Sequence, residues 1–256
     1  MKKFTIFLLI AACTIVFSCA SKKNIEVEKS VSKPLINMIR VEGCIENINS
    51  FFLGIYPVKQ SEYIEIMETN PSFFKGDDLP VESVTWKNAV EFCNRLSLRE
   101  GLTPAYIIEG DDVFWNRDAN GYRLPTDAEW EYACRAGTTT PFNTGNSIST
   151  SQANYDGRFP FNSNVRGEHR AKTTPVGYFA ANTWGLFDMH GNVWEWCWDD
   201  PNSQEPDSSV LSVDTLRLIR GGAWSSSGRS LHSSFRSGFQ PLWKNNYIGF
   251  RVARNE

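Results

Sequence analysis

Three motifs in the last third of the chain constrain the fold more than any other feature. They are Gly185–Trp196, Arg220–Trp224 and Ile248–Arg251, and each combines glycine, aromatic and charged residues. Between the last two lies the segment 225–247, which shows neither a helical period nor the alternation of a strand. It mixes small polar residues with Phe, Trp, Tyr and His, which is typical of adaptable binding surfaces. We therefore expect a rigid frame that holds an ordered loop.

The N-terminus carries an export signal. Lys2 and Lys3 precede a mostly apolar run, Phe4–Phe17, which is shorter than the roughly 20 residues that a membrane-spanning helix needs. Residues 1–18 therefore form a predicted secretory signal peptide. The following Cys19 resembles the lipidated residue of a bacterial lipoprotein, although Val16 and Phe17 depart from the usual pattern. The alternative is an ordinary secreted protein cleaved near Ala20.

The composition indicates one domain behind a tether. Residues 19–33 comprise the lipidated cysteine and a polar, charged tether, and residues 34–256 form a single domain without an internal repeat. Removal of residues 1–18 takes away two lysines and no acid, so the formal charge changes from −3 to −5. A mildly acidic, secreted domain is not expected to bind nucleic acid, and we expect a monomer.

The cysteines of the domain argue against a zinc site and against a disulfide framework. No two of them have a CxxC spacing. Cys93 and Cys134 fall on the apolar faces of predicted helices, where a thiol acts as a small buried hydrophobe. We therefore expect free thiols at the four positions Cys44, Cys93, Cys134 and Cys197.

Two helices are well marked and a third is weaker. Thr85 can cap a helix over residues 86–96, and Thr126 with Glu129 forms a capping box for a helix that ends before Gly137. Residues 61–67 are the weaker candidate. The best predicted strands are residues 51–56, 176–179 and 216–219. The result is a loop-rich α+β domain.

Six motifs follow one another along the chain, namely Tyr56–Tyr63, Pro80–Trp86, Tyr122–Ala133, Gly185–Trp196, Arg220–Gly222 and Gly249–Arg251. Together they closely resemble the formylglycine-generating enzyme, or sulfatase-modifying factor, family. The resemblance covers the chain from about residue 50 to the C-terminus. It implies a variant of the C-type lectin fold, with two helices, small sheets and long loops supported by ions.

The family resemblance also indicates whether the chain is an enzyme. The family's oxidases use two cysteines that bind copper(I), a metal that prefers thiolates. Here those positions are His232 and Ser237, and no cysteine follows Cys197, so we expect neither copper nor catalysis. Another branch of the family uses an iron site made of three histidines. This chain has only His169, His190 and His232, and His190 belongs to a structural motif, so we do not expect this iron site. The remaining alternatives are a formylglycine-type oxidase and a carboxylate pair among Asp199, Asp200 and Asp214.

A binding protein is the preferred interpretation. The position of segment 225–247, its frame and the lipoprotein-like N-terminus are similar to the variable lipoproteins that diversity-generating retroelements produce in spirochaetes. This similarity implies a lipid-anchored protein at the outer membrane or cell surface, with a protein or glycan ligand. The alternative is a family member that is not diversified and has a structural role. The expected ligand-binding residues are Ser226, Arg229, Ser230, His232, Phe235, Ser237, Phe239, Gln240, Leu242, Trp243, Asn245 and Tyr247. The expected buried frame residues are Trp224, Arg236, Ile248 and Phe250.

The resemblance implies bound calcium. Asp188, Glu195 and the backbone oxygens of Gly191 and Val193 match a calcium site of the family, and oxygen ligands suit this hard cation. Alternatively, Glu195 only braces its loop through hydrogen bonds. A second family site matches Asn154, for which Glu168 is the candidate acid.

Overall fold

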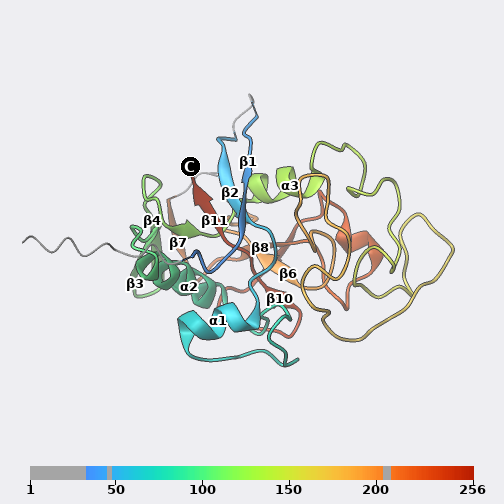
Figure 1. The fold of residues 1–256 in the computed structure, drawn as a ribbon, viewed down its shortest axis with the longest axis horizontal. Coiled ribbons are helices and arrows are strands. Elements are labelled where there is room, and N and C mark those ends of the chain that lie inside the picture. Colours follow the sequence, from blue (N-terminus) through green and yellow to red (C-terminus); the bar gives the residue numbers. More distant parts are fainter. Residues whose placement is uncertain (1–32, 45–47, 204–208) are drawn as a thin grey trace, which may run out of the picture. The chain divides into compact units, whose positions relative to one another are not determined.

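The computed structural model describes residues 33–44, 48–203 and 209–256. The predicted signal peptide, Cys19 and most of the tether therefore lie outside the described residues. Helices α1 to α3 occur among short strands (Figure 1). The 3₁₀-helix η1 lies in segment 225–247. None of the helices in the described part of the chain has the length and apolar content that a bilayer span requires. The helices are α1 (Gln60–Met67), α2 (Trp86–Arg99), α3 (Asp127–Arg135) and η1 (Gly228–Leu231).

Three small sheets carry the fold. The first has the order β1-β2-β11-β5, the second β10-β6-β8-β9 and the third β3-β4-β7. In the second sheet β10 pairs with β6 in parallel, whereas β8 pairs with β6 and β9 in antiparallel orientation. The strands are β1 (Met38–Val41), β2 (Phe51–Gly54), β3 (Tyr106–Glu109), β4 (Asp112–Trp115), β5 (Tyr122–Arg123), β6 (Trp194–Trp196), β7 (Val210–Ser212), β8 (Arg217–Arg220), β9 (Ser237–Phe239), β10 (Ile248–Gly249) and β11 (Ala253–Asn255).

Both strongly predicted helices are confirmed, together with their caps. The Thr85 hydroxyl accepts from the Asn88 N–H at 3.0 Å, and Thr126 and Glu129 bond each other reciprocally. The α3 helix ends at Ala136, which has a left-handed φ of 45°, directly before Gly137. The weaker candidate, residues 61–67, is also a helix and corresponds to α1. The Glu62 carboxylate accepts a hydrogen bond from the Lys59 N–H and so caps the start of this helix. The described chain thus has three α-helices where two were firmly expected.

Two of the three strand predictions are confirmed and one is wrong. Residues 51–56 and 216–219 contain β2 and most of β8. Residues 176–179 are wrong as a strand, since Tyr178 N–H bonds back to Pro175 and Gly177 takes a positive φ of 73°. A turn at this position aims the Gly177 N–H at Asp188, where it donates to the carboxylate at 2.7 Å.

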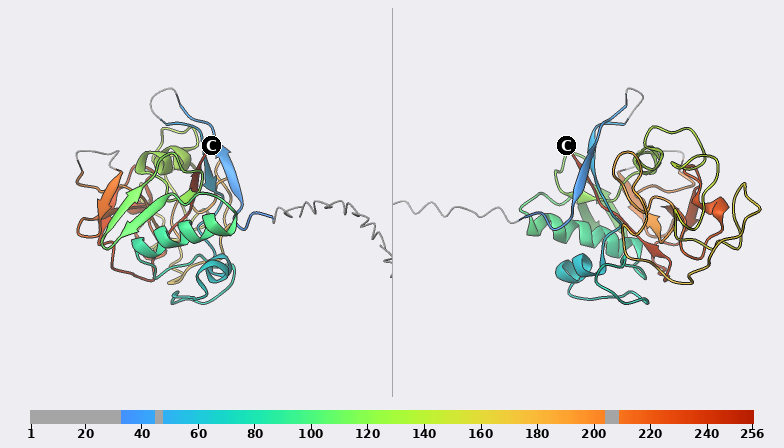
Figure 2. Two further views of the ribbon diagram at one scale, coloured as in Figure 1. Left: turned by 90° about the vertical axis from the view of Figure 1, so that its left-hand side faces the viewer. Right: turned by 45° about the vertical axis from the view of Figure 1, so that its right-hand side comes forward.

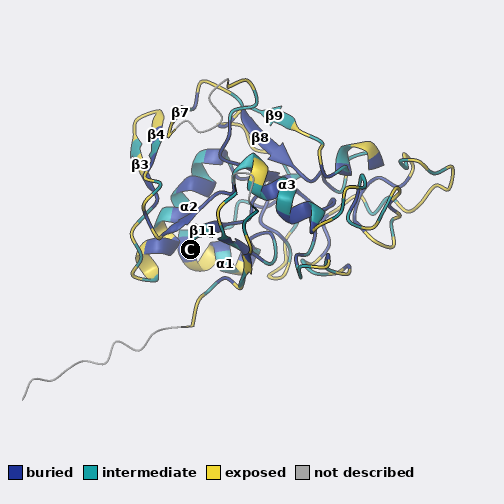
Figure 3. Ribbon diagram, turned by 90° about the horizontal axis from the view of Figure 1, so that it is seen from above, coloured by how far each residue is buried: buried dark blue, intermediate teal, exposed yellow. Residues whose placement is uncertain are grey.

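The core lies between α2 and the second sheet. Ala89, Phe92, Cys93 and Leu96 form the predicted apolar stripe of α2, and none of them is exposed. Figure 3 shows β8 as buried along its length, while its neighbour β9 is only half-buried. The second sheet therefore runs from a buried strand to a half-buried edge that belongs to segment 225–247.

Long loops gather at one end of the domain. Residues 137–193 contain no helix and no strand longer than an isolated bridge. The right-hand view of Figure 2 places η1 at the same end as these loops, and the Gly228 N–H donates to the Phe159 carbonyl at 2.8 Å. The loop-rich end of the domain is thus where segment 225–247 begins.

Candidate functional site

Two residues before the segment the chain contains a glycine pair whose backbone conformation favours glycine. Gly221 and Gly222 have φ values of 91° and 77°, which residues with a Cβ rarely adopt. A Cβ at Gly222 would lie 2.8 Å from a methyl carbon of Leu231, and one at Gly221 would lie 3.1 Å from the Trp130 ring. The Arg-Gly-Gly motif therefore fixes how the chain leaves β8 and enters segment 225–247.

The backbone of the segment is held by donors outside it. Arg220 Nη1 donates to the carbonyls of Ser233 and Phe235 at 3.1 and 2.8 Å, and His190 Nδ1 bonds the Leu231 carbonyl at 2.7 Å. Four further carbonyls accept from frame groups, so the path of the segment does not depend on its own exposed side chains. These pairs are Pro241 with Trp86 N–H, Asn245 with Ser83 N–H, Asn246 with Trp224 Nε1–H and Tyr247 with Trp194 N–H.

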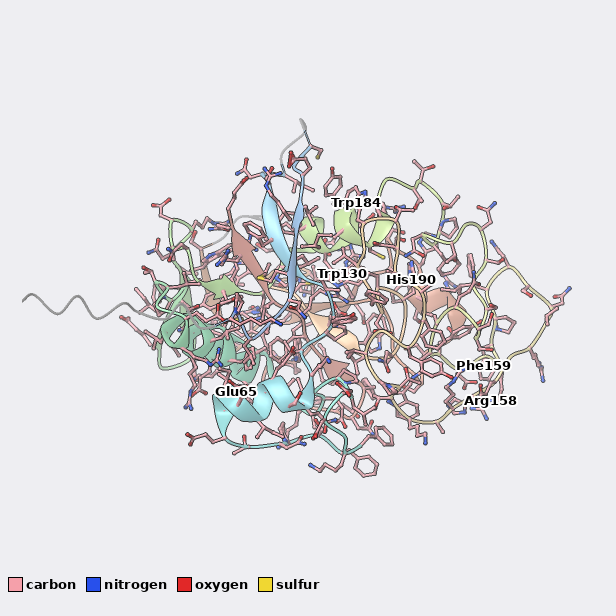
Figure 4. The ribbon with its side chains drawn as sticks, in the orientation of Figure 1. Glu65, Trp130, Arg158, Phe159, Trp184 and His190 are labelled. Carbon is pink, nitrogen blue, oxygen red and sulfur yellow. The ribbon has the colours of Figure 1, made fainter. Side chains whose placement is uncertain are left out.

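The donors are themselves fixed by buried ion pairs and tight packing. Arg220 is fully buried and bonds Asp127 and Glu131 of α3, each at 2.6 Å. His190 is buried, and burial lowers its pKa to about 4, so it is neutral near pH 7. Figure 4 shows His190 in the interior, between Trp130 and the loop-rich end of the domain. The sequence predicts that His190 belongs to a structural motif. In the structure its ring bonds the Leu231 carbonyl.

The side chains of the segment divide into two groups. All twelve predicted ligand-binding residues are half-buried or exposed. Four other residues of the segment are buried, namely Gly228, Leu231, Ser233 and Pro241. An interior set therefore anchors the segment, while the predicted set stays at least partly accessible. Of that set, Phe235, Phe239 and Tyr247 also pack against the core.

Two frame predictions are wrong. Trp224 is half-buried, because its indole lies against Phe74 and His169 at the surface instead of in the core. Arg236 is exposed and pairs with Asp127 at 3.0 Å, since the buried place beside Asp127 belongs to Arg220. Ile248 and Phe250 are buried as expected.

Aromatic side chains cover the sheet next to β9. Phe235 lies on Trp194 and Phe239 on Trp196, with ring centroids 6.0 and 5.9 Å apart. Phe239 also contacts Trp243, which is 64% exposed, and Tyr247. This cluster presents rigid apolar area at the surface, the property of aromatic anchors in binding sites.

The two positions that match catalytic cysteines belong to different environments. The His232 ring lies 5.9 Å from the rings of both Phe142 and Phe161, and burial lowers its pKa. Ser237 lies in β9, where it is paired with Ile219 of β8. In the described residues no hydrogen bond joins His232 to Ser237. This pair offers no thiolate and no hydrogen-bonded nucleophile and base.

Of the three aspartates considered as a carboxylate pair, only Asp199 is buried. It accepts from the Asp127 N–H at the start of α3 at 2.6 Å, and burial raises its pKa to about 6. Asp200 is half-buried and Asp214 is exposed. The carboxylate of Asp199 thus anchors a helix N-terminus.

Glu195, one of the predicted calcium ligands, forms an ion pair with Arg251. Its two oxygens accept from Arg251 at 2.6 and 2.7 Å, and one also accepts from Trp130 Nε1–H at 2.6 Å. The positive guanidinium of Arg251 lies so close to the Glu195 carboxylate that it would repel a second cation there. Glu195 therefore does not fit direct calcium coordination in this arrangement. Asp188 is buried beside a cavity of about 130 Å³, and burial raises its pKa to about 6. Gly191 and Val193 are buried in the same turn.

The second predicted site keeps a suitable oxygen. Asn154 is fully buried, and its Oδ1 has no hydrogen-bond partner among the described residues, while its Nδ2 donates to the Lys172 carbonyl. An unpartnered buried amide oxygen fits a hard cation. Glu168 does not face it in a shared cluster, because its exposed carboxylate pairs with Arg170. In the described ranges no group of three or more His, Cys, Asp or Glu side chains could hold a metal, so calcium stays a prediction.

All four cysteines of the domain are free, as expected. Cys93, Cys134 and Cys197 are buried, and burial raises the pKa of each thiol, that of Cys134 to about 12. A thiol with so high a pKa is a poor nucleophile near pH 7. These cysteines are therefore packing residues.

Sequence reasoning missed one part of this surface. Arg158 and Phe159 lie in a distant loop that the backbone bond from Gly228 to Phe159 joins to η1. Both are exposed, and Figure 4 shows them side by side at the loop-rich end, far from Glu65 on α1. The only signal in the sequence was the same mixture of Gly, Ser, Arg and Phe, without a spacing that ties it to segment 225–247.

Solved structures share this fold. Treponema denticola variable protein 1 superposes with a TM-score of 0.69 and 25% sequence identity, covering 86% of this chain and 94% of that protein. The fold is therefore that of the α+β, C-type lectin-like group expected from the sequence.

Protein relatives extend over the same region. Chaperone protein LppX of Paenibacillus barcinonensis is 34% identical over 293 residues, covering the whole of both chains. The formylglycine-generating enzyme of Mycobacterium tuberculosis is 40% identical over 121 residues, which are 45% of this chain and 40% of the enzyme. The chain thus spans well under two thirds of that enzyme's length. The family model of the sulfatase-modifying factor enzyme 1-like domain matches residues 44–256, and the chain belongs to this family.

Proposed function

We propose that this protein is a non-catalytic binding protein whose residues 225–247 form a diversified recognition site. The observation that carries the proposal is the division of labour within the segment. Frame donors such as Arg220, His190 and Trp86 hold its carbonyls, while the twelve predicted contact residues are half-buried or exposed. Side chains on such a loop can change while the backbone stays in place.

The similarity to a variable protein supports this assignment. At 25% identity the likeness extends through most of both chains. The sequence between the frame motifs contains neither Asp nor Glu nor Met, and it carries Ser, Arg, Phe, Trp and Tyr. In binding sites, Tyr, Trp and Arg supply most of the energy and Ser supplies adaptable hydrogen bonds.

Lack of catalysis is part of the proposal. His232 and Ser237 cannot replace two copper-binding thiolates, and the buried thiols elsewhere have raised pKa values. The purified chain should not convert the cysteine of a sulfatase-type peptide to formylglycine, with or without copper. Formylglycine above the background of a peptide-only control, detected by mass spectrometry, would overturn this part.

Display at the cell surface completes the proposal. Cys19 would carry the lipid, residues 20–33 the tether, and the domain would reach ligands outside the bacterial outer membrane. The ligand would be a protein or a glycan. Neither nucleic acid nor a second copy of the chain is expected at this face.

Photo-crosslinking from defined positions tests the site. A photoreactive amino acid at Trp243 or Arg229 should crosslink to one and the same partner on intact host material. The matched control is Ile107 on β3, which is also exposed but lies outside the segment. Crosslinks of equal yield from Ile107, or none from Trp243 and Arg229, would place binding elsewhere.

A second candidate function is chaperoning. The full-length similarity to Chaperone protein LppX favours it, and exposed apolar groups such as Trp243 and Leu242 could contact an unfolded chain. The full chain would then suppress aggregation of a denatured client in a light-scattering assay. If it does not, while crosslinking from Trp243 succeeds, recognition of a folded ligand is the remaining function.

A further inference from the structure

The recognition surface extends beyond segment 225–247. The companion loop, residues 156–172, contacts the segment through the Asp156 N–H to Ser226 carbonyl bond of 2.9 Å and the Gly228 N–H to Phe159 carbonyl bond of 2.8 Å. At its other end the His169 ring stacks on Trp224, whose indole N–H donates to the Asn246 carbonyl. Loop and segment therefore form one continuous surface.

This surface has the opposite charge to the rest of the protein. Residues 156–172 and 225–247 together carry seven Lys or Arg and two Asp or Glu, a net charge of +5. The total is −3, so the remainder of the chain carries −8. Such a separation of charge within one domain attracts partners of a single sign to one face.

Six of the seven positive side chains are exposed, and both negative ones are held in ion pairs. Asp156 is buried and held by Arg158, and Glu168 pairs with Arg170. Six cationic side chains on the surface are exposed: Arg158, Arg166, Lys172, Arg229, Arg236 and Lys244. Arg236 is the member of this set that pairs with an acid of α3.

Arg158 and Phe159 form a preorganised contact element. Asp156 bonds the Arg158 guanidinium at 2.8 and 2.7 Å, yet 57% of the Arg158 side chain is exposed. Phe159 is 58% exposed, and the guanidinium of Arg158 lies 5.9 Å from its ring centroid. The arginine is held in one place while its outer face and the neighbouring ring stay available.

We infer that the partner is a protein that presents an acidic surface, and that Arg158 and Phe159 bind it together with Arg229 of the segment. This inference rests on the proposed function and names the class of ligand. Exposed Arg229 and Trp243 in segment 225–247, which has no Asp or Glu, and exposed Phe159 in the companion loop match the composition of protein interfaces. This favours a protein over an anionic glycan. The positive charge supplies the attraction to an acidic patch.

Selection from a random peptide library on phage tests the inference, with the full chain purified in detergent as target. The selected peptides should be enriched in Asp and Glu beside aromatic residues. Their affinity should fall about tenfold or more between 50 and 500 mM NaCl because salt screens exposed charges. Heparin on a sensor chip serves as the anionic glycan probe and should bind weakly or not at all.

Charge reversal locates the contact. Arg229→Glu, and separately Arg158→Gln with Phe159→Ser, should each weaken the selected peptides about tenfold, the scale of a lost interface contact. The matched control is Lys87→Glu on α2, which changes the net charge as much as Arg229→Glu and should leave affinity unchanged. Near-native melting temperatures of the variants separate loss of contact from loss of fold.

The outcomes separate this inference from the proposed function. Neutral or basic peptides that depend on Trp243 would leave the recognition site standing and overturn the acidic partner. Tight heparin binding that is lost in Arg229→Glu, without acidic peptides, would assign the face to an anionic glycan and overturn the protein partner. A library without binders, or binders that survive Trp243→Ala and Tyr247→Ala, would overturn both proposals.

Discussion

Arg251 and Glu195 form an ion pair in which neither side chain is exposed, with Nε 2.6 Å from Oε2 and Nη2 2.7 Å from Oε1. The guanidinium also donates to the carbonyls of Gly54 and Phe187. One residue of the C-terminal Gly-Phe-Arg motif thus ties together the first sheet, the turn at Asp188 and β6. The frame of segment 225–247 depends on this joint, because β10 and β6 border the segment on one side.

Breaking this pair should be severe. Glu195→Ala leaves a buried guanidinium without its counter-charge, which costs about 3–5 kcal/mol of unfolding free energy. Replacing both partners, as Glu195→Leu with Arg251→Met, should cost less than Glu195→Ala alone. Urea unfolding of the native chain, the single variant and the double variant measures these free energies. A double variant that is less stable than Glu195→Ala would contradict the prediction.

Calcium should act through Asn154. If its unpartnered Oδ1 binds calcium, free calcium at about 100 times Kd should add about 2.7 kcal/mol to the unfolding free energy, and EGTA should remove the gain. Asn154→Ala should abolish the response. Glu195→Gln should keep it, because that carboxylate is committed to Arg251. No rise in melting temperature for the native chain would speak against bound calcium.

Asp199 should make stability depend on pH. Burial raises its folded pKa to about 6 from an unfolded value of 3.8. Its stabilising contribution is therefore complete below pH 3.8 and is lost as the pH rises through 6, because the folded state must then hold a buried charge.

The Asp199→Asn variant removes this dependence, while its amide oxygen can still accept from the Asp127 N–H. The variant should gain on the order of 3 kcal/mol relative to the native chain between pH 4 and pH 7. Comparing the two proteins at each pH cancels the other titrating groups. A constant difference across this range would mean that Asp199 has an ordinary pKa.

Local signals predicted the elements that local interactions determine. Thr85 and Thr126 marked two helix starts because a capping hydroxyl bonds its own helix. The turn at Gly177 escaped detection because its N–H is satisfied by Asp188, a partner visible only in the fold.

The site was predictable as a segment and not as a surface. Position between two motifs identified residues 225–247, and the twelve chosen side chains are half-buried or exposed; which of them bind a ligand stays a prediction. Arg236 was misassigned because the sequence does not show that Arg220 already fills the place beside Asp127. Trp224 was misassigned because its partners Phe74 and His169 are far from it in the sequence. Arg158 and Phe159 were missed because only backbone bonds across the fold bring their loop to η1.

Lipidation of Cys19 is a separate prediction from the sequence. Labelling with radioactive palmitate in the native host should mark the wild-type chain and not Cys19→Ala. The variant should also move from the membrane to the soluble fraction, because a lipid chain supplies the membrane affinity. Equal labelling of both proteins would show that the anchor lies elsewhere or is absent.

Substitutions in the segment should separate binding from stability. Arg229→Ala and Trp243→Ala remove exposed side chains and should change the unfolding free energy by no more than about 0.5 kcal/mol. Leu231→Ala and Phe250→Ala open cavities in buried positions and should cost about 2–5 kcal/mol. Thermal melting and crosslinking yield, measured on the same proteins, distinguish the groups. If Trp243→Ala unfolds the domain as much as Phe250→Ala, its ring is part of the core and the recognition site must lie on another face.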